Sequence, residues 1–125
     1  MRARELGAAV AVLPGKSPAS ARVVLDFVGT DQTLALAAKV VERGGIVVQI
    51  GEAGGSAPFG LGRVPNEAVF TTSIWGSIEE LNAVLDCARR GDLQWDVEAL
   101  PLAEANTALK RLRQGEVRGR LVLVP

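Results

Sequence analysis

The side chains that most often perform catalysis or bind metals are scarce in this sequence. It contains no His, no Tyr and a single Cys, Cys87. A zinc site needs three or four ligands, mostly His or Cys, and a Ser-His-Asp or Cys-His catalytic group requires His. Any chemistry must therefore rest on carboxylates, Lys, Arg, backbone amides or a bound cofactor. The single Cys also excludes a disulfide within the chain and favours a reducing, cytoplasmic location.

Two glycines that follow apolar runs are candidates for ligand binding. Gly29 comes after the largely apolar residues 23–28, and Gly51 comes after residues 46–50. In open α/β sheets, ligands bind beyond the carboxyl ends of the strands, and Gly lets the backbone approach them closely. The alternative is that each Gly only turns the chain. The Gly-rich segment 51–55 lacks the G-x-G-x-x-G spacing, so it does not indicate a phosphate-binding loop.

Six other side chains stand out by their type and position. Asp26 lies inside an apolar run, where we expect it to bond a loop amide or an Arg rather than to catalyse a reaction. Cys87 is interpreted as a small core residue. Trp75 could line a pocket or fill the core, and Trp95 is expected to anchor packing. Arg120, with Arg118, could clamp a phosphate or remain a solvated surface pair.

The pattern of apolar residues predicts alternating strands and helices. The predicted strands are 22–28, 46–50, 67–74 and 119–124, and the predicted helices are 2–6, 32–42, 77–91 and 103–114. Thr30 or Asp31 should cap the second helix, and Ser77 with Glu80 forms a capping box for the third. Residues 52–66 are predicted to be a long loop and residues 92–101 to be irregular. Nearly continuous apolar strands are typical of parallel sheets, so the sequence predicts an α/β fold.

The length and net charge of the chain restrict the classes of protein to which it could belong. The 125 residues suffice for one domain, spanning 1–125, and 14 basic residues balance 14 acidic ones. The balance argues against a nucleic-acid partner or a polybasic membrane patch. The apolar run 6–13 after a basic start has the outline of a signal peptide, but it is short and Ala-rich. No run reaches the 18 apolar residues of a membrane span.

Taken in order, six segments resemble a known family. They are 24–29, 33–37, 44–51, 75–77, 101–106 and 119–125. In this order and spacing they are similar to the carboxyl-terminal part of zinc-dependent, medium-chain alcohol dehydrogenases. The resemblance implies a Rossmann-type doubly wound, mostly parallel sheet, NAD as cofactor, and oxidation of an alcohol to an aldehyde or ketone by hydride transfer to NAD.

The resemblance also implies positions for the cofactor-binding residues. The adenosine half would lie beside Phe27, Val28 and Gly29, and the nicotinamide ribose beside Ile50 and Gly51. The nicotinamide carboxamide would be approached by Ser73, Ile74 and Trp75, and the pyrophosphate by Arg120. Residues 67–74 would pair with their copy in a homodimer, or with a complementing chain.

The departures from the family pattern lead to two hypotheses. The zinc-binding catalytic domain, the first two strands of the cofactor domain, the Gly-rich turn and the acidic ribose-binding residue have no counterpart in this sequence. We therefore expect a fragment with a free apolar sheet edge, without catalytic or metal-binding residues of its own, that holds cofactor poorly by itself. The first hypothesis is the cofactor-binding portion of an NAD-dependent alcohol dehydrogenase. The second is a non-catalytic dimerisation or interaction module derived from that fold.

Overall fold

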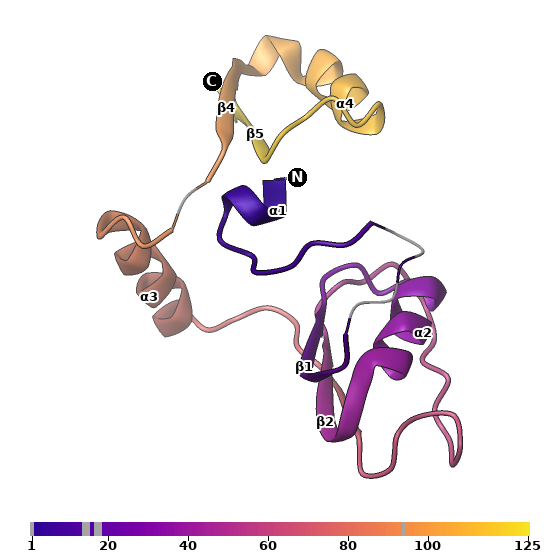
Figure 1. Cartoon of the computed structure of the whole chain (residues 1–125). Coiled ribbons are helices and arrows are strands. Elements are labelled where there is room, and N and C mark those ends of the chain that lie inside the picture. Colours follow the sequence, from indigo (N-terminus) through magenta and orange to yellow (C-terminus); the bar gives the residue numbers. More distant parts are fainter. Residues whose placement is uncertain (1, 14–15, 17–18, 94) are drawn as a thin grey trace. The chain divides into compact units, whose positions relative to one another are not determined.

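The computed structural model describes residues 2–13, 16, 19–93 and 95–125. Its elements in chain order are α1 (Arg2–Glu5), β1 (Ala21–Asp26), α2 (Asp31–Val40), β2 (Val41–Gln49), β3 (Val69–Thr72), α3 (Ile78–Arg89), β4 (Val97–Pro101), the 3-10 turn η1 (Leu102–Glu104), α4 (Ala105–Arg113) and β5 (Arg120–Val124). Two compact units are present, Met1–Trp75 and Gly76–Pro125. Figure 1 shows these elements, and each unit is described by itself.

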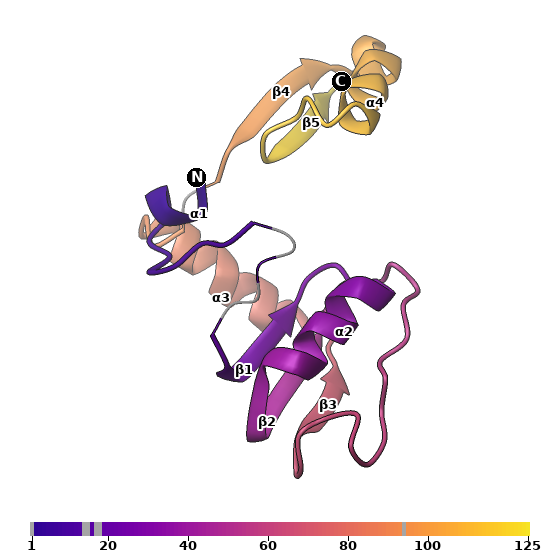
Figure 2. The same ribbon diagram turned by 45° about the vertical axis from the view of Figure 1, so that its right-hand side comes forward.

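The first unit is built on a parallel three-stranded sheet with the order β1-β2-β3. Val24 of β1 lies opposite Val47 of β2, which lies opposite Phe70 of β3. Helix α2 connects β1 to β2 and covers one face of the sheet, as Figure 2 shows. This βαβ arrangement confirms the α/β fold with a mostly parallel sheet. Strand β3 is shorter than the predicted 67–74, because Glu67 has a φ of 65° and interrupts the extended backbone.

Helix α2 begins as predicted but ends earlier. The Thr30 hydroxyl accepts a hydrogen bond from the Thr33 amide and completes a capping box. The helix ends at Val40 rather than Glu42, and β2 begins at once with Val41, which pairs with Ala21 of β1. The predicted stop at the Gly44–Gly45 pair was wrong, since both glycines belong to β2. Strand pairing therefore decides where the helix ends.

The core of the first unit lies between α2 and the sheet. Leu34 is 1% exposed and Val47 is 1% exposed, and Ala37 and Val41 are also buried. Val24, Ala68 and Phe70 pack against this cluster as partly buried side chains. The edge strand β1 leaves Val23 and Leu25 more than half exposed. β1 is an edge strand of this sheet and carries exposed apolar side chains.

The second unit contains a strand that the sequence did not reveal. Residues 92–101 were predicted to be irregular, but β4 pairs in parallel with β5, and Ala99 lies opposite Val122. Gly119, with a φ of 70°, allows the close approach that starts this pairing, because a Cβ there would lie 2.0 Å from the Asp96 carbonyl oxygen. β5 thus belongs to a two-stranded sheet rather than to the sheet of β1, β2 and β3. The predicted helix 103–114 divides into η1 and α4.

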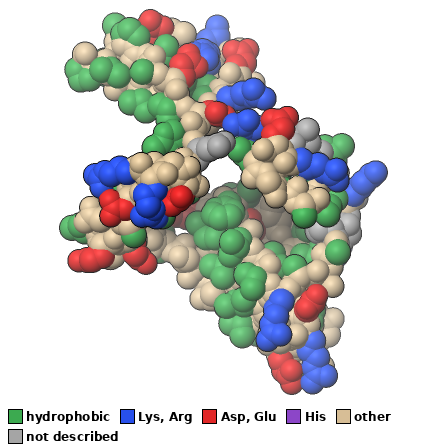
Figure 3. Space-filling view, turned by 60° about the vertical axis from the view of Figure 1, so that its left-hand side comes forward, with side chains coloured by type: hydrophobic (Ala, Val, Ile, Leu, Met, Phe, Trp, Pro, Cys, Tyr) green, Lys and Arg blue, Asp and Glu red, His purple; other side chains and the backbone are tan. Residues whose placement is uncertain are grey.

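Most apolar side chains of the second unit face outward within it. Ser77 and Glu80 form the predicted capping box of α3, and the helix carries exposed Leu81 and Val84. Figure 3 shows hydrophobic side chains reaching the molecular surface. Cys87 is half-buried rather than a core residue, and Trp95 is 60% exposed rather than a packing anchor.

Candidate functional site

The ends of β1 and β2 are joined by backbone hydrogen bonds. The Asp26 carbonyl oxygen accepts hydrogen bonds from the amides of Ile50, at 2.8 Å, and Gly51, at 3.0 Å. Farther along, the Ala53 amide donates to the Val28 carbonyl at 3.2 Å, and Gly55 donates to Gly29 at 2.8 Å. Segments 26–29 and 50–55, which contain residues predicted to approach the cofactor, are therefore bonded to each other at the carboxyl edge of the sheet. They form a pair of interlocked loops.

Gly29 and Gly51 are required for this interlock. A Cβ on Gly51 would lie 2.2 Å from the Val28 carbonyl carbon, and a Cβ on Gly29 would lie 2.1 Å from the Gly51 carbonyl oxygen. Gly29 also has a φ of 75°, a backbone conformation that is unfavourable for residues with a side chain. Each Gly thus does more than turn the chain, since it lets the two loops touch.

Asp26 fixes the first of these loops. Its side chain is 6% exposed, and Oδ1 accepts hydrogen bonds from the amides of Val28, at 2.9 Å, and Gly29, at 3.0 Å. Burial acts to raise the pKa of the Asp26 carboxyl, but hydrogen bonds from the Gly29 and Val28 amides and the Thr33 side chain together outweigh it, so the pKa lies below its usual value. These contacts fit the prediction that Asp26 is a structural carboxylate that bonds loop amides.

A cavity lies where β2 and β3 end. Its volume is about 240 Å³, and its lining residues are Gln49, Ile50, Gly51, Glu52, Thr72, Ser73 and Ile74. The Ser73 amide donates to the Gln49 carbonyl at 2.9 Å and holds the two strand ends together. Four of the predicted nicotinamide-side residues, Ile50, Gly51, Ser73 and Ile74, therefore line one cavity. Backbone pairing in a parallel sheet places these sequence-distant residues side by side.

Sequence reasoning missed three members of this lining, namely Gln49, Glu52 and Thr72. Each is next in sequence to a predicted residue, so their position at the strand ends was the available signal. The Gln49 side-chain amide donates to the Gly51 carbonyl at 3.0 Å and supports the turn that leaves β2. Glu52, an exposed residue, is the ionisable member of this lining, and Thr72 is one of its hydroxyl-bearing members.

A second cavity lies between β1 and α2. It has a volume of about 370 Å³ and is lined mainly by apolar residues, Phe27 and Val28 among them. Gly29 is not among its lining residues, so the predicted adenosine-side set is divided between this cavity and the interlocked loops. Asp26 and Thr33 are the polar residues of its lining.

The two remaining predicted residues lie outside both cavities. Trp75 is 91% exposed, and its φ of 62° is unusual for a bulky side chain. Arg120 starts β5 in the second unit, where its amide donates to the Asp96 carbonyl at 2.9 Å. The expected contacts of Trp75 with a carboxamide and of Arg120 with a pyrophosphate stay predictions.

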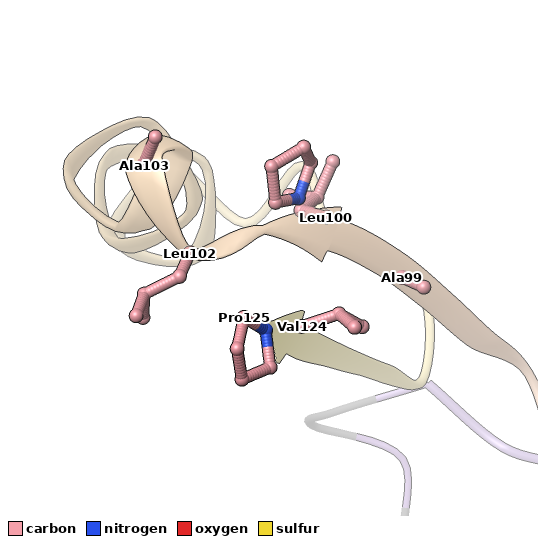
Figure 4. Close-up of a pocket in the computed structure, with 7 residues that line it drawn as sticks. Ala99, Leu100, Leu102, Ala103, Val124 and Pro125 are labelled. Carbon is pink, nitrogen blue, oxygen red and sulfur yellow. The ribbon is translucent and has the colours of Figure 1, made fainter.

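The second unit has its own apolar hollow. Its volume is about 480 Å³, and Figure 4 shows Leu102 and Pro125 extending from the ends of β4 and β5 beside it. Its lining carries no ionisable side chain. Across the described residues of the chain, no group of three or more His, Cys, Asp or Glu side chains is arranged to hold a metal ion. In that same part of the chain, each helix is too short or too polar to span a bilayer.

Comparisons with known proteins agree with one another. The chain matches the family described as zinc-binding dehydrogenase over residues 8–123. The D-arabinose 1-dehydrogenase (NADP(+)) of Saccharolobus solfataricus is 29% identical over 114 residues, which cover 84% of this chain and 30% of that protein. The crystal structure of the alcohol dehydrogenase of Aeropyrum pernix superposes with a TM-score of 0.75 at 34% identity, covering 85% of this chain and 31% of that one.

A further structural neighbour was determined in complex with NAD. The acetophenone reductase of Geotrichum candidum superposes with a TM-score of 0.79 at 27% identity and covers 98% of this chain and 37% of its own. The chain thus spans about a third of the length of these proteins.

Proposed function

Because the chain belongs to the zinc-binding dehydrogenase family of medium-chain alcohol dehydrogenases, we propose that it supplies part of the NAD site of such an enzyme. The reaction proposed for the whole protein is the oxidation of an alcohol to an aldehyde or ketone. The observation that carries the proposal is the cavity at the ends of β2 and β3, whose lining includes Ile50, Gly51, Ser73 and Ile74.

The residues of this cavity fit the nicotinamide end of a dinucleotide. Ile50 and Ile74 offer apolar side chains to a flat ring, while Thr72 and Ser73 offer hydroxyls and backbone groups to a carboxamide. The cavity lies beyond the carboxyl ends of parallel strands, where open α/β sheets bind their ligands. The interlocked loops that follow β1 and β2 fix Gly51 in its wall.

The roles of these residues are to bind and orient. When bound, nicotinamide supplies a hydride acceptor, so the alcohol carbon loses a hydride and its hydroxyl loses a proton. Ile50 and Ile74 would exclude water from one side of the ring, and Ser73 would fix its orientation. The described residues of this chain do not fit a zinc site, so no step of the reaction is assigned to a metal held by them.

The test is a titration of the isotope-labelled chain with NAD, followed by nuclear magnetic resonance. We expect the amide signals of Ile50, Gly51, Ser73 and Ile74 to shift at millimolar NAD. The variant Ser73→Phe fills the cavity and should abolish these shifts, whereas Ser20→Phe, at an exposed position directly before β1, should leave them. NAD-induced shifts that persist in the Ser73→Phe variant would contradict the proposed site.

A dimer through β3 is proposed as a second property. β3 forms an edge of the three-stranded sheet, and Val69 on it is 52% exposed. An exposed edge strand is a ready template for a second copy of itself. Sedimentation of the chain should give a dimer, and Val69→Lys should shift it toward the monomer. A monomer at all concentrations would exclude the homodimer through β3, and the interaction-module hypothesis would then require a complementing chain as the partner.

A further inference from the structure

The cavity at the ends of β2 and β3 has an asymmetric charge. Of its seven described lining residues, Glu52 alone is ionisable. The others are apolar residues, glycine, or uncharged polar residues that cannot offset a carboxylate. In the described part of the chain, Glu52 forms no ion pair and no hydrogen bond through its side chain. The cavity therefore carries an uncompensated negative charge.

Backbone hydrogen bonds on both sides of Glu52 fix this residue in the lining of the cavity. Glu52 directly follows Gly51, whose amide is bonded to the Asp26 carbonyl and whose carbonyl accepts from the Gln49 side chain. One residue later, the Ala53 amide donates to the Val28 carbonyl. The backbone on both sides of Glu52 is thus hydrogen-bonded to β1, its loop, or the end of β2.

A negative charge at this position discriminates between the two redox forms of a nicotinamide ring. The oxidised ring is a cation and the reduced ring is neutral, while the rest of the dinucleotide is the same. A carboxylate attracts the cation and leaves the neutral ring almost unaffected. It also disfavours phosphate groups in the same cavity, since like charges repel.

We propose that Glu52 is a specificity-determining residue that makes this cavity prefer the oxidised, positively charged form of the nicotinamide. The inference rests on the proposed function, because it assumes that the cavity receives the nicotinamide ring. It assigns to Glu52 the task of favouring loading with oxidised cofactor and release of reduced cofactor. No proton transfer is assigned to its carboxylate.

The test compares the dissociation constants of NAD and NADH, measured on the full chain by nuclear magnetic resonance titration. We expect Glu52→Gln to lower the preference for NAD over NADH about threefold and Glu52→Lys to lower it roughly tenfold, as an interaction across water allows. Raising the salt from about 0.01 M to about 1 M should bring the wild-type preference close to that of Glu52→Gln, because the Debye length shrinks from about 30 Å to about 3 Å.

The matched control is Glu42→Gln. Glu42 lies near the amino end of β2, whereas the cavity lies beyond its carboxyl end at Gln49. The same loss of charge there should leave the ratio of the two dissociation constants unchanged. An equal response of Glu42→Gln and Glu52→Gln, or no response to Glu52→Lys, overturns this inference while leaving the proposed function intact. Failure of both NAD and NADH to shift the cavity amides overturns both.

Discussion

The two units of this chain bury very different amounts of apolar side chain. Of the described residues, six buried hydrophobic side chains lie in the first unit, namely Leu34, Ala37, Ala38, Val40, Val41 and Val47, and one, Ala108, lies in the second. The first unit encloses its core between α2 and three strands. The second unit pairs two strands beside α4 and leaves Leu109 and Leu112 at least half exposed within the chain.

This contrast shows which parts of the chain can define a site. In the first unit, packing under α2 and the Asp26 hydrogen bonds fix the loops that line the cavities. In the second, the Ser77 capping box starts α3, while β4 is held by its pairing with β5 and by the ion pair of Arg111 with Glu98. Such contacts specify secondary structure, but they place side chains less firmly than a buried core does.

Leu34→Ala is expected to cause the largest loss of stability, and it tests the contrast between the two units. Leu34 lies on the buried face of α2 and is 1% exposed, so its truncation should lower the free energy of unfolding of the first unit by about 3 kcal/mol. Leu109→Ala, at a residue 50% exposed in the second unit, should cost less than about 1 kcal/mol. Urea unfolding followed by circular dichroism measures both. Equal costs would show that the second unit has a core of the same quality.

Gly51→Ala tests the interlocked loops. The added Cβ would collide with the Val28 backbone, and such overpacking should cost about 2 kcal/mol. The comparison is Gly54→Ala, where a φ of 79° disfavours a side chain but no atom lies within 4 Å, so about 1 kcal/mol is expected. Thermal unfolding measures the difference. Gly51→Ala should also displace the amide signals of Val28 and Ile50, and unchanged signals would argue against the interlock.

Acidification tests the contribution of Asp26. The folded pKa of this carboxyl lies below its usual value, so its ionised form stabilises the fold above the unfolded pKa of about 3.9. This stabilisation is lost as the pH falls through the lower, folded pKa. The free energy of unfolding is measured by urea titrations between about pH 6 and about pH 2. It should fall less with decreasing pH in Asp26→Asn than in the wild type, because the variant has no carboxyl at this position. Parallel curves would mean that the amide bonds do not favour the charged form.

Arg111→Ala is expected to have the smallest effect on stability. The Arg111 guanidinium donates to both oxygens of Glu98, at 2.7 Å and 2.9 Å. Its hydrogen bonds and positive charge lower the pKa of Glu98, but an exposed pair contributes little to folding. The variant should return the Glu98 pKa toward its ordinary value, which a pH titration followed by nuclear magnetic resonance would show. The thermal unfolding temperature should hardly change. A marked loss of stability would make this pair a main support of the second unit.

Patterns with strong local chemistry were predictable from the sequence. The capping residues Thr30 and Ser77 marked the starts of α2 and α3. The predicted strands 22–28 and 46–50 located β1, which ends two residues earlier at Asp26, and the second half of β2. Of the cavity residues, Gly51 was named because it follows an apolar strand, beyond whose carboxyl end ligands bind in open α/β sheets. Ile50, Ser73 and Ile74 were named only from the family resemblance.

Features that depend on long-range pairing were not predictable in the same way. β4 carries Glu98 and Pro101 in a short, weakly apolar stretch, and only pairing with β5 makes it a strand. The end of α2 at Val40 depends on the pairing of Val41 with Ala21. Glu52 lines a cavity only because β3 ends beside it. The sequence alone therefore offered no reason to assign a function to its charge.

The junction of α2 with β2 has a consequence for changes in chain length. Val40 is the last helical residue and Val41 the first of the strand, so no connecting residue separates the two elements. An insertion or deletion here would rotate the buried face of the helix or shift the register of the strand. By contrast, nothing lies within 4 Å of a Cβ on Gly62. Length variation and inserted labels are therefore expected to be accommodated around Gly62 rather than at the helix–strand junction, which has a fixed length.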